Sequence, residues 1–332
     1  MENKSIIWKK GQELLGSKYA ILGGAMSWVS EHNLVAAISN AGGFGVLACG
    51  AMNADLLEKE IKATQRLTSN PFGVNLITMH PELDELIEIC KKNNVTHVVL
   101  AGGLPKSYMI DALKQANIKV IAFAPALVIA KKLIKMRVDG IVIEGMEAGG
   151  HIGPVSTTVL AQEILPILKD EIPIFVAGGI GRGEMIAQFL KMGAAGCQLG
   201  TRFVCANESI AHENFKNIFL KSQARDTITS IQLDSNFPVI PVRALANKGT
   251  DEFLKAQRNA IDEYNDGKLS KEEAQLKIEK FWAGALRRAV IDGDIEYGSV
   301  MAGQSVGMVS KTQSTKEIIE ELVDQTYNSY FY

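Results

Sequence analysis

The chain is most constrained by eight short apolar runs that recur at intervals of roughly 20 to 35 residues, the length of one βα unit. The runs are largely apolar and several are rich in β-branched residues, a pattern typical of strands buried on both faces of a parallel sheet. The runs are Ala20–Leu22, Gly45–Ala48, Phe72–Leu76, His97–Leu100, Val120–Phe123, Gly140–Ile143, Ile174–Val176 and Cys197–Leu199. The sequence therefore predicts a parallel sheet of eight strands.

Stretches with helical periodicity lie between these runs. They are Asn53–Ala63, Glu82–Asn93, Tyr108–Ala116, Leu127–Met136, Thr158–Lys169 and Glu184–Met192. Asn117 and Gly193 stand just past the ends of two of them, where a left-handed cap residue is favoured. Alternating strands and helices form either a closed (β/α)8 barrel or a doubly wound open sheet. Eight units within about 200 residues favour the barrel, so we predict an α/β TIM barrel.

The alternation of short apolar runs with helical stretches ends at about residue 215, and we expect a second part of the chain after it. Residues 251–294 are charged and helix-rich, and we interpret them as helices packed on or beside the barrel. A glycine-rich segment, Gly298–Gln304, then returns towards the core, and an amphipathic helix is predicted over Thr315–Gln325. We thus expect a barrel over 1–214, a helical insertion or C-terminal extension over 215–295, and a return segment with the final helix over 296–332.

Composition excludes several classes of protein. The 332 residues carry 35 Lys+Arg against 37 Asp+Glu, a net charge of -2, which excludes a broadly basic nucleic-acid binder. A hydrophobic fraction of 47% is too high for a disordered chain. The first 15 residues carry charges and lack the long apolar stretch of a secretory leader, and no run approaches about 18 apolar residues. We therefore expect an unprocessed cytoplasmic protein without a membrane segment. The four cysteines are widely scattered, which predicts buried, reduced thiols.

The loop after the sixth run, Glu144–Gly153, combines a histidine and two carboxylates with several glycines. In a barrel, the loops that follow the strands converge on the face where ligands bind. Imidazole titrates near neutral pH, so His151 can act there as a base or an acid. The other histidines have no such setting, and we interpret them as structural.

Two further loops suggest an anion site. Gly178 and Gly179 follow the seventh run, and Gly200 and Thr201 follow the eighth. In barrels these two loops often bind phosphate through backbone N–H groups. A phosphorylated ligand is therefore expected, and Arg202 could add a charge or make a structural ion pair.

One apparent metal motif is discounted. Residues 262–273 are similar to an EF-hand calcium loop, but Tyr264 stands where the third position needs an oxygen ligand. We predict a turn between two helices there, and no metal site in the chain.

The motifs together resemble the nitronate monooxygenase (2-nitropropane dioxygenase) family, which includes flavin-dependent enoyl-ACP reductases. The resemblance covers nearly the whole chain. It is carried by the loop after the first run, Gly24–Trp28, by a PFGVN segment at 71–75, by the histidine loop, by AGGIG at 177–181 and by QLGTRFV at 198–204. Glu208-Ser209 and Gly298–Gln304 look especially like the enoyl-reductase branch. The resemblance implies an FMN-dependent (β/α)8 barrel.

The resemblance also implies roles for residues at matching positions. His151 would be catalytic and would lie over the reacting face of the flavin. Met26 and Asn75 would lie beside the isoalloxazine ring, and the two loops that suggest an anion site would hold the phosphate. The implied FMN-binding residues are Gly24, Ala25, Met26, Asn75, Glu144, Ala148, Gly149, Gly178, Gly179, Gln198, Gly200 and Thr201.

The sequence departs from the reductase pattern at two places. Gly23 stands where the reductases carry Gln, and Ala101–Lys106 replaces an AGAGNP-like loop that shapes the substrate side and is associated with a monovalent cation. These departures concern the substrate rather than FMN.

Three functions follow as expectations. The first is FMN-dependent oxidation of alkyl nitronates with O2, in which His151 orients the nitronate or removes a proton from a neutral nitroalkane. The second is an NAD(P)H-dependent enoyl-ACP reductase, whose acyl carrier protein would be recognised by basic residues such as Lys106, Arg182 and Arg202. The third is a non-catalytic barrel that binds a phosphorylated ligand. The aromatic end of the chain could contact a partner subunit, which would make a homodimer.

Overall fold

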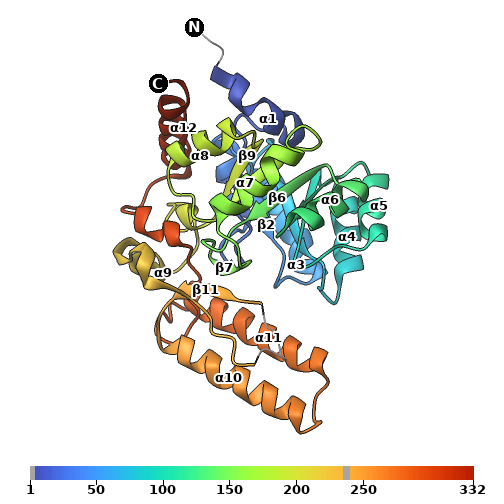
Figure 1. Cartoon of the computed structure of the whole chain (residues 1–332), viewed down its shortest axis with the longest axis vertical. Helices are drawn as coiled ribbons and strands as arrows, with labels where there is room; N and C mark the ends of the chain where they lie inside the picture. Colours follow the sequence, from blue (N-terminus) through green and yellow to red (C-terminus); the bar gives the residue numbers. More distant parts are fainter. Residues whose placement is uncertain (1–3, 235–239) are drawn as a thin grey trace.

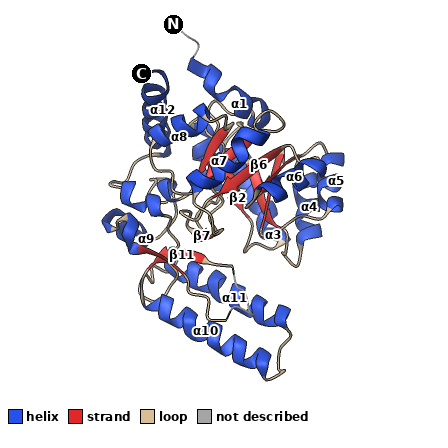
Figure 2. Cartoon of the chain, viewed as in Figure 1, coloured by secondary structure: helices blue, strands red, loops and turns tan. Residues whose placement is uncertain are grey.

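The computed structural model describes residues 4–234 and 240–332, and its centre is a parallel sheet of eight strands. The order around the sheet is β1-β9-β8-β6-β5-β4-β3-β2. Its two edges also meet, because the Gly23 N–H donates to the Phe44 carbonyl and the Phe44 N–H donates to the Ile21 carbonyl, both at 2.9 Å. The sheet therefore closes, and helices surround it (Figure 2), so the predicted (β/α)8 barrel is confirmed.

All eight predicted strands are confirmed. Their side chains are buried almost throughout, because one face lines the barrel interior and the other packs under the helices. The strands are β1 (Ile21–Gly23), β2 (Val46–Ala48), β3 (Gly73–Ile77), β4 (His97–Ala101), β5 (Lys119–Phe123), β6 (Gly140–Glu144), β8 (Ile174–Ala177) and β9 (Gly196–Leu199).

The six predicted barrel helices are confirmed as well, and the expected left-handed residues are found at Asn117 (φ 58°) and Gly193 (φ 102°). The helices are α3 (Ala54–Leu67), α4 (Leu83–Lys92), α5 (Ser107–Gln115), α6 (Leu127–Lys135), α7 (Thr157–Leu168) and α8 (Gly183–Lys191). In the described part of the barrel, residues 4–212, two further α-helices were not predicted, α1 (Lys9–Leu15) and α2 (His32–Asn40). Helix α2 contacts the C-terminal helix as well as its neighbour α3, so it lacks a charged outer face.

The second part of the chain contains strands as well as the expected helices. Its elements are α9 (Glu213–Lys221), β10 (Thr227–Thr229), β11 (Val242–Leu245), α10 (Lys248–Asn265) and α11 (Lys271–Val290). Strand β11 pairs antiparallel with both β10 and β7 (Gly150–His151), the latter within the histidine loop. This small sheet, which the sequence did not predict, joins the second part to the barrel (Figure 1).

Helices α10 and α11 form a hairpin that projects away from the barrel (Figure 1). The hairpin has a small core of its own, built around Phe253, Ile278 and Trp282. The turn that resembles an EF-hand loop joins its two helices, as predicted, and Ser270 and Glu273 form a capping box at the start of α11. Further along α11, however, Leu286, Ala289 and Val290 belong to the core of the barrel.

The C-terminal helix α12 (Thr315–Phe331) packs against α8. The Gly183 N–H, at the start of α8, donates to Gln325 Oε1 at 2.8 Å, and Thr326 Oγ1 donates to the Gly183 carbonyl at 3.1 Å. Within the chain, Trp8 Nε1 donates to the hydroxyl of Tyr327 at 3.2 Å. Short 3-10 helices complete the fold at η1 (Lys4–Trp8), η2 (Thr201–Phe203), η3 (Ala224–Asp226) and η4 (Gln304–Met308). Within the described ranges, no helix combines the length and apolar character needed to span a membrane.

The contact between α8 and α12 leaves no room for a side chain at residue 183. A Cβ there would lie 2.1 Å from the Leu322 carbonyl oxygen, so we expect Gly183→Ala to lower the unfolding free energy by about 1–3 kcal/mol or more. The matched change Gly284→Ala, in an open part of α11 with no atom within 4 Å of the added Cβ, should stabilise by about 0.5–1 kcal/mol. Chemical unfolding of the full chain measures both, and equal effects would contradict this account of the α8–α12 contact.

Candidate functional site

The predicted site residues lie at one end of the barrel. Because all eight strands run parallel, their carboxyl ends and the loops that follow them share that end. The loop after β1 contributes Gly24, Ala25 and Met26, and the end of β3 contributes Asn75. The loops after β6, β8 and β9 contribute the remaining residues, which are Glu144, Ala148, Gly149, His151, Gly178, Gly179, Gln198, Gly200 and Thr201.

The loops after β1 and β9 touch through their backbones. The Gly24 N–H donates to the Leu199 carbonyl at 2.8 Å, and a Cβ on Gly24 would lie 3.2 Å from Gly200 Cα. A Cβ on Gly200 would in turn lie 3.4 Å from the sulfur of Met26. Ser30 Oγ fixes the first loop, since it accepts from the Met26 N–H and donates to the Gly24 carbonyl. Met26 is thus directed towards the loop that carries Thr201.

Two buried amide side chains lie in the strands below these loops. Asn75, at the middle of β3, donates from Nδ2 to the Val99 carbonyl at 3.0 Å. Gln198 lies on β9 between Leu22 of β1 and Ala177 of β8. Each is a polar residue in a strand that is otherwise apolar. This is the feature by which the sequence distinguishes the two residues as site candidates.

Glu144 ends β6 and is half-buried. Removal of the carboxyl from water raises its pKa from 4.5 to about 8, because desolvation disfavours the charged form. Near neutral pH the group is therefore mostly protonated, and it can donate a hydrogen bond as well as accept one.

Glu147, the second carboxylate of the histidine loop, has a different setting. Its Oε2 accepts from both the backbone N–H and the hydroxyl of Thr157, each at 2.8 Å. Thr157 begins α7, where unpaired N–H groups favour a negative charge. The Thr157 hydroxyl also lies 3.1 Å from the Gly178 carbonyl. Glu147 therefore ties the histidine loop to α7 and, through Thr157, to the loop after β8.

His151 lies on the two-residue strand β7 and is exposed. It pairs with Val242 of β11, and the next backbone N–H, that of Ile152, donates to the Pro241 carbonyl at 2.9 Å. Arg243 reinforces this pairing, since its Nε donates to the Met146 carbonyl at 2.9 Å. Its side chain is buried, and burial lowers the pKa of its guanidinium. Sequence reasoning missed Arg243, although an arginine inside the apolar segment 240–246 was the available signal.

The return segment predicted to approach the core reaches the site. A Cβ on Gly149 would lie 2.5 Å from Gly303 N, so the two backbones are in contact. The Gln304 N–H donates to the Glu147 carbonyl at 2.9 Å, and the Gly303 N–H donates to Thr201 Oγ1 at 3.0 Å. The return segment therefore links the histidine loop to the loop after β9.

The loops after β8 and β9 retain the donors expected of an anion site. Among the described residues, none accepts a hydrogen bond from the N–H groups of Gly178, Gly179, Gly200 or Thr201. Gly178 and Gly179 have φ of 97° and 71°, in the region that favours glycine. Free N–H groups on adjacent loops are the donor set that binds a phosphate, so the residues present fit such a group.

The three basic residues expected around a carrier-protein surface are placed differently. Lys106 is exposed, and Arg182 is exposed but paired with Glu184. Arg202 is only 3% exposed, and its Nη2 lies 3.2 Å from Glu321 Oε2 of α12. The prediction for Arg202 as a surface residue is therefore wrong, because it makes the structural ion pair instead.

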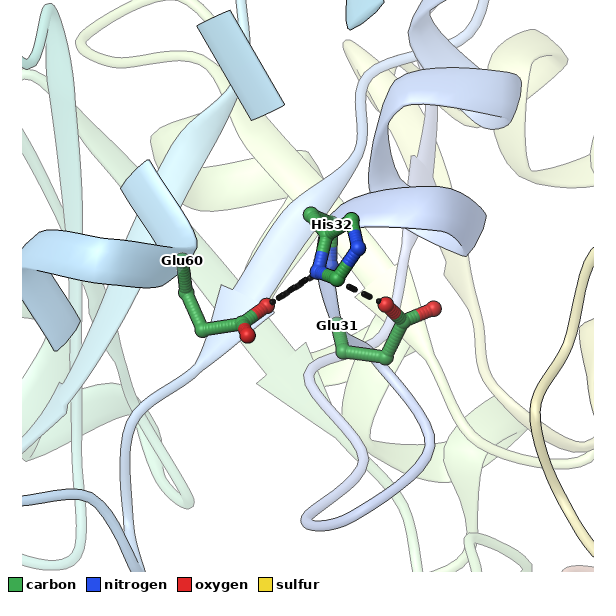
Figure 3. Close-up of side chains that lie close together, drawn as sticks. All are labelled: Glu31, His32 and Glu60. Atoms are coloured by element: carbon green, nitrogen blue, oxygen red, sulfur yellow. Dashed lines mark hydrogen bonds and ion pairs between the residues drawn. The ribbon is translucent and has the colours of Figure 1, made fainter. Parts of the chain in front are cut away.

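A cluster of Glu31, His32 and Glu60 lies where α2 meets α3 (Figure 3). The His32 Nδ1 is 2.9 Å from Glu31 and 2.8 Å from Glu60. Both carboxylates also accept from the start of α2, Glu31 from the Leu34 N–H and Glu60 from the His32 N–H. This cluster therefore caps α2, in line with the structural interpretation of His32.

Comparisons with known proteins agree on the family. A family model described as nitronate monooxygenase matches residues 9–93 and 82–325. The (3aS,4S,5R,7aS)-5-hydroxy-7a-methyl-1-oxo-octahydro-1H-indene-4-carboxyl-CoA dehydrogenase of Rhodococcus jostii is 30% identical, over 94% of this chain and 93% of that protein. FabK from Thermotoga maritima has a TM-score of 0.84 at 34% identity, over 96% of both chains. A nitroalkane oxidase from Streptomyces ansochromogenes has a TM-score of 0.77 at 25% identity, over 96% of this chain and 98% of that one.

The raised pKa of Glu144 predicts a pH-dependent stability. The folded protein binds this proton more tightly than the unfolded chain does, so the stabilisation is complete below pH 4.5 and is lost as the pH rises to about 8. We expect Glu144→Gln to lack this loss. The melting temperature of the variant should therefore rise relative to that of the wild type as the pH is raised from 4.5 to about 8. The exposed Glu163→Gln is the matched control and should follow the wild type. If the melting temperatures of the wild type and Glu144→Gln change with pH in parallel, Glu144 does not have a raised pKa in the folded protein.

Proposed function

Because the chain belongs to the nitronate monooxygenase family of oxidoreductases, we propose that it is an FMN-dependent enzyme that uses NAD(P)H to reduce an acyl thioester. The observation that carries this proposal is the likeness to FabK, an enoyl-ACP reductase, at a TM-score of 0.84 over 96% of the chain. Since that coverage includes the second part of the chain, the likeness extends beyond the barrel. The relative from Rhodococcus, a carboxyl-CoA dehydrogenase, supports a thioester as well.

The residues at the carboxyl end of the barrel fit FMN. The free N–H groups of Gly178, Gly179 and Thr201 would hold its phosphate. Glu144, largely protonated near neutral pH, would donate a hydrogen bond to an acceptor atom of the bound ring system. When bound, FMN supplies the hydride-transfer chemistry, and the protein supplies orientation and electrostatics.

His151 is the proposed proton donor. Reduction of a carbon–carbon double bond next to a thioester carbonyl adds one hydride and one proton. An exposed imidazole at the mouth of the barrel can give that proton and regain one from water. The β7–β11 pairing fixes the backbone from which this side chain extends, so the proton is delivered from a defined position.

Nitronate oxidation with O2 is the second candidate. It is favoured by the description of the family model and by the likeness to a nitroalkane oxidase, at 25% identity over 96% of the chain. In this reaction His151 would orient the nitronate or remove a proton from a neutral nitroalkane. The same FMN site would serve both reactions.

The first test is the visible spectrum of the purified protein. We expect a yellow protein, or a colourless one that gains a flavin spectrum when FMN is added. Anaerobic titration then separates the two candidates. Rapid bleaching by NADH or NADPH supports the thioester reductase, whereas bleaching by a nitronate alone supports nitronate oxidation. A protein that stays colourless with FMN would overturn both proposals and favour a non-catalytic barrel.

A second test concerns His151. We expect His151→Ala to bind FMN as the wild type does and to lower kcat by about 10²- to 10⁴-fold, the usual contribution of a general acid or base. The kcat of the variant and of the wild type is measured at saturating reductant. An unchanged kcat would remove His151 from the mechanism. His80→Ala is a suitable control, because this half-buried histidine lies in the loop after β3 and has no proposed role.

A further inference from the structure

Trp28 occupies a backbone conformation that suits glycine. The Val29 and Ser30 N–H groups both donate to the Met26 carbonyl, so residues 26–30 form a tight turn, and Trp28 within it has φ 68°. A turn with positive φ at its third residue normally takes Gly or Asn there, and a bulky residue is strained. The other described non-glycine residues with positive φ are Asn94, Asn117 and Arg137. Each of those follows a helix end, where left-handed residues are common.

The side chain of Trp28 gives a reason for this strained placement. The guanidinium carbon of Arg287, on α11, lies 5.7 Å from the centroid of the indole, within the range of a cation–π interaction. The indole N–H is buried and has no acceptor among the described residues. Glycine would form the same turn with less backbone strain. The indole ring, rather than the shape of the turn, therefore explains a tryptophan at this position.

Arg287 lies at the junction between the hairpin and the barrel. Before it, Ile278 and Trp282 belong to the small core of the hairpin, and after it, Ala289 and Val290 belong to the core of the barrel. Ser299 packs at the same junction, since its N–H donates to the Ala285 carbonyl at 2.9 Å. Its buried hydroxyl has no partner among the described residues, so this junction holds two unsatisfied groups.

We propose that Trp28 and Arg287 form a clasp that couples the α10–α11 hairpin to the first loop of the site. The clasp positions Met26, two residues before Trp28, against the loop that carries Thr201. It also holds the hairpin, and β11, which directly precedes α10, pairs with the strand that carries His151. Trp28 and Arg287 are thus positioning residues for the substrate. Their effect on catalysis rests on the proposed function, whereas the coupling itself does not.

Amide hydrogen exchange tests the coupling in the FMN-free and the FMN-treated full chain. We expect Arg287→Leu and Trp28→Leu each to speed exchange in two segments, residues 24–31 and 242–265, by about 2- to 5-fold, the range set by a cation–π contact with an exposed arginine. The double variant should exchange no faster than either single variant, because one contact links the two segments. Arg287→Lys should restore part of the protection.

The chain offers a matched control in the next residue. Arg288 is as exposed as Arg287, at 46% against 48%. Each pairs with an aspartate, Arg287 with Asp292 at 3.0 Å and Arg288 with Asp294 at 3.9 Å. Arg288→Leu therefore removes an ion pair without removing the Trp28 contact, and it should leave both segments as in the wild type. Trp28→Gly removes the ring while suiting the backbone, and it should behave like Trp28→Leu. If Trp28→Gly keeps wild-type exchange, or if Arg287→Leu matches Arg288→Leu, the clasp is refuted.

Kinetics of the FMN-loaded protein provide the second measurement. We expect Arg287→Leu to raise the KM for the substrate by about 2- to 5-fold with a smaller change in kcat, and Arg287→Lys to recover part of it. An unchanged KM in Arg287→Leu would overturn the positioning role. A protein that binds no FMN would overturn the proposed function instead, and the exchange data would still decide whether the clasp exists.

Discussion

The pairing of β7 with β11 is the constraint on which the candidate site depends. Buried or half-buried backbone groups need partners, and the histidine loop finds them in a strand far along the chain. The pairing fixes the backbone at His151, and Arg243 reaches from the same strand to the Met146 carbonyl. On the other side, Glu147 and the return segment hold the loop to α7 and to Thr201. The second part of the chain is therefore part of the site rather than an appendage.

The barrel could be predicted from the sequence because its signals are local. A strand buried on both faces is a run of apolar residues such as Val120–Phe123, and in the helix after it the apolar positions recur about every 3.6 residues. Strand β7 offers no such signal, since it is two residues long, one of them glycine, and it exists only through its pairing with β11. Helix α2 was missed for a related reason, because α12 covers the face that would otherwise be polar.

The site shows the same division between local and non-local information. Glu144 and Glu147 have the same side chain and lie in one glycine-rich loop, so the sequence cannot assign them different tasks. Their surroundings do so, because Glu147 meets the N–H and hydroxyl of Thr157, whereas burial raises the pKa of Glu144 to about 8. Arg202 illustrates the same point, since only the position of α12 shows that its charge is used inside the fold.

The division of α11 between two cores bears on how the proposed clasp couples the hairpin to the barrel. A hairpin with its own apolar core can move as a unit without losing most of its contacts, whereas the last turn of α11 is anchored in the barrel. A cation–π contact with an exposed arginine contributes about 0.5–1 kcal/mol, so under the proposed clasp the arrangements with and without this contact would differ by little in free energy. A ligand shifts such a balance only by its difference in affinity for the two arrangements. A substrate that contacts both the hairpin and the first loop would have that difference, and one that contacts only the barrel would not.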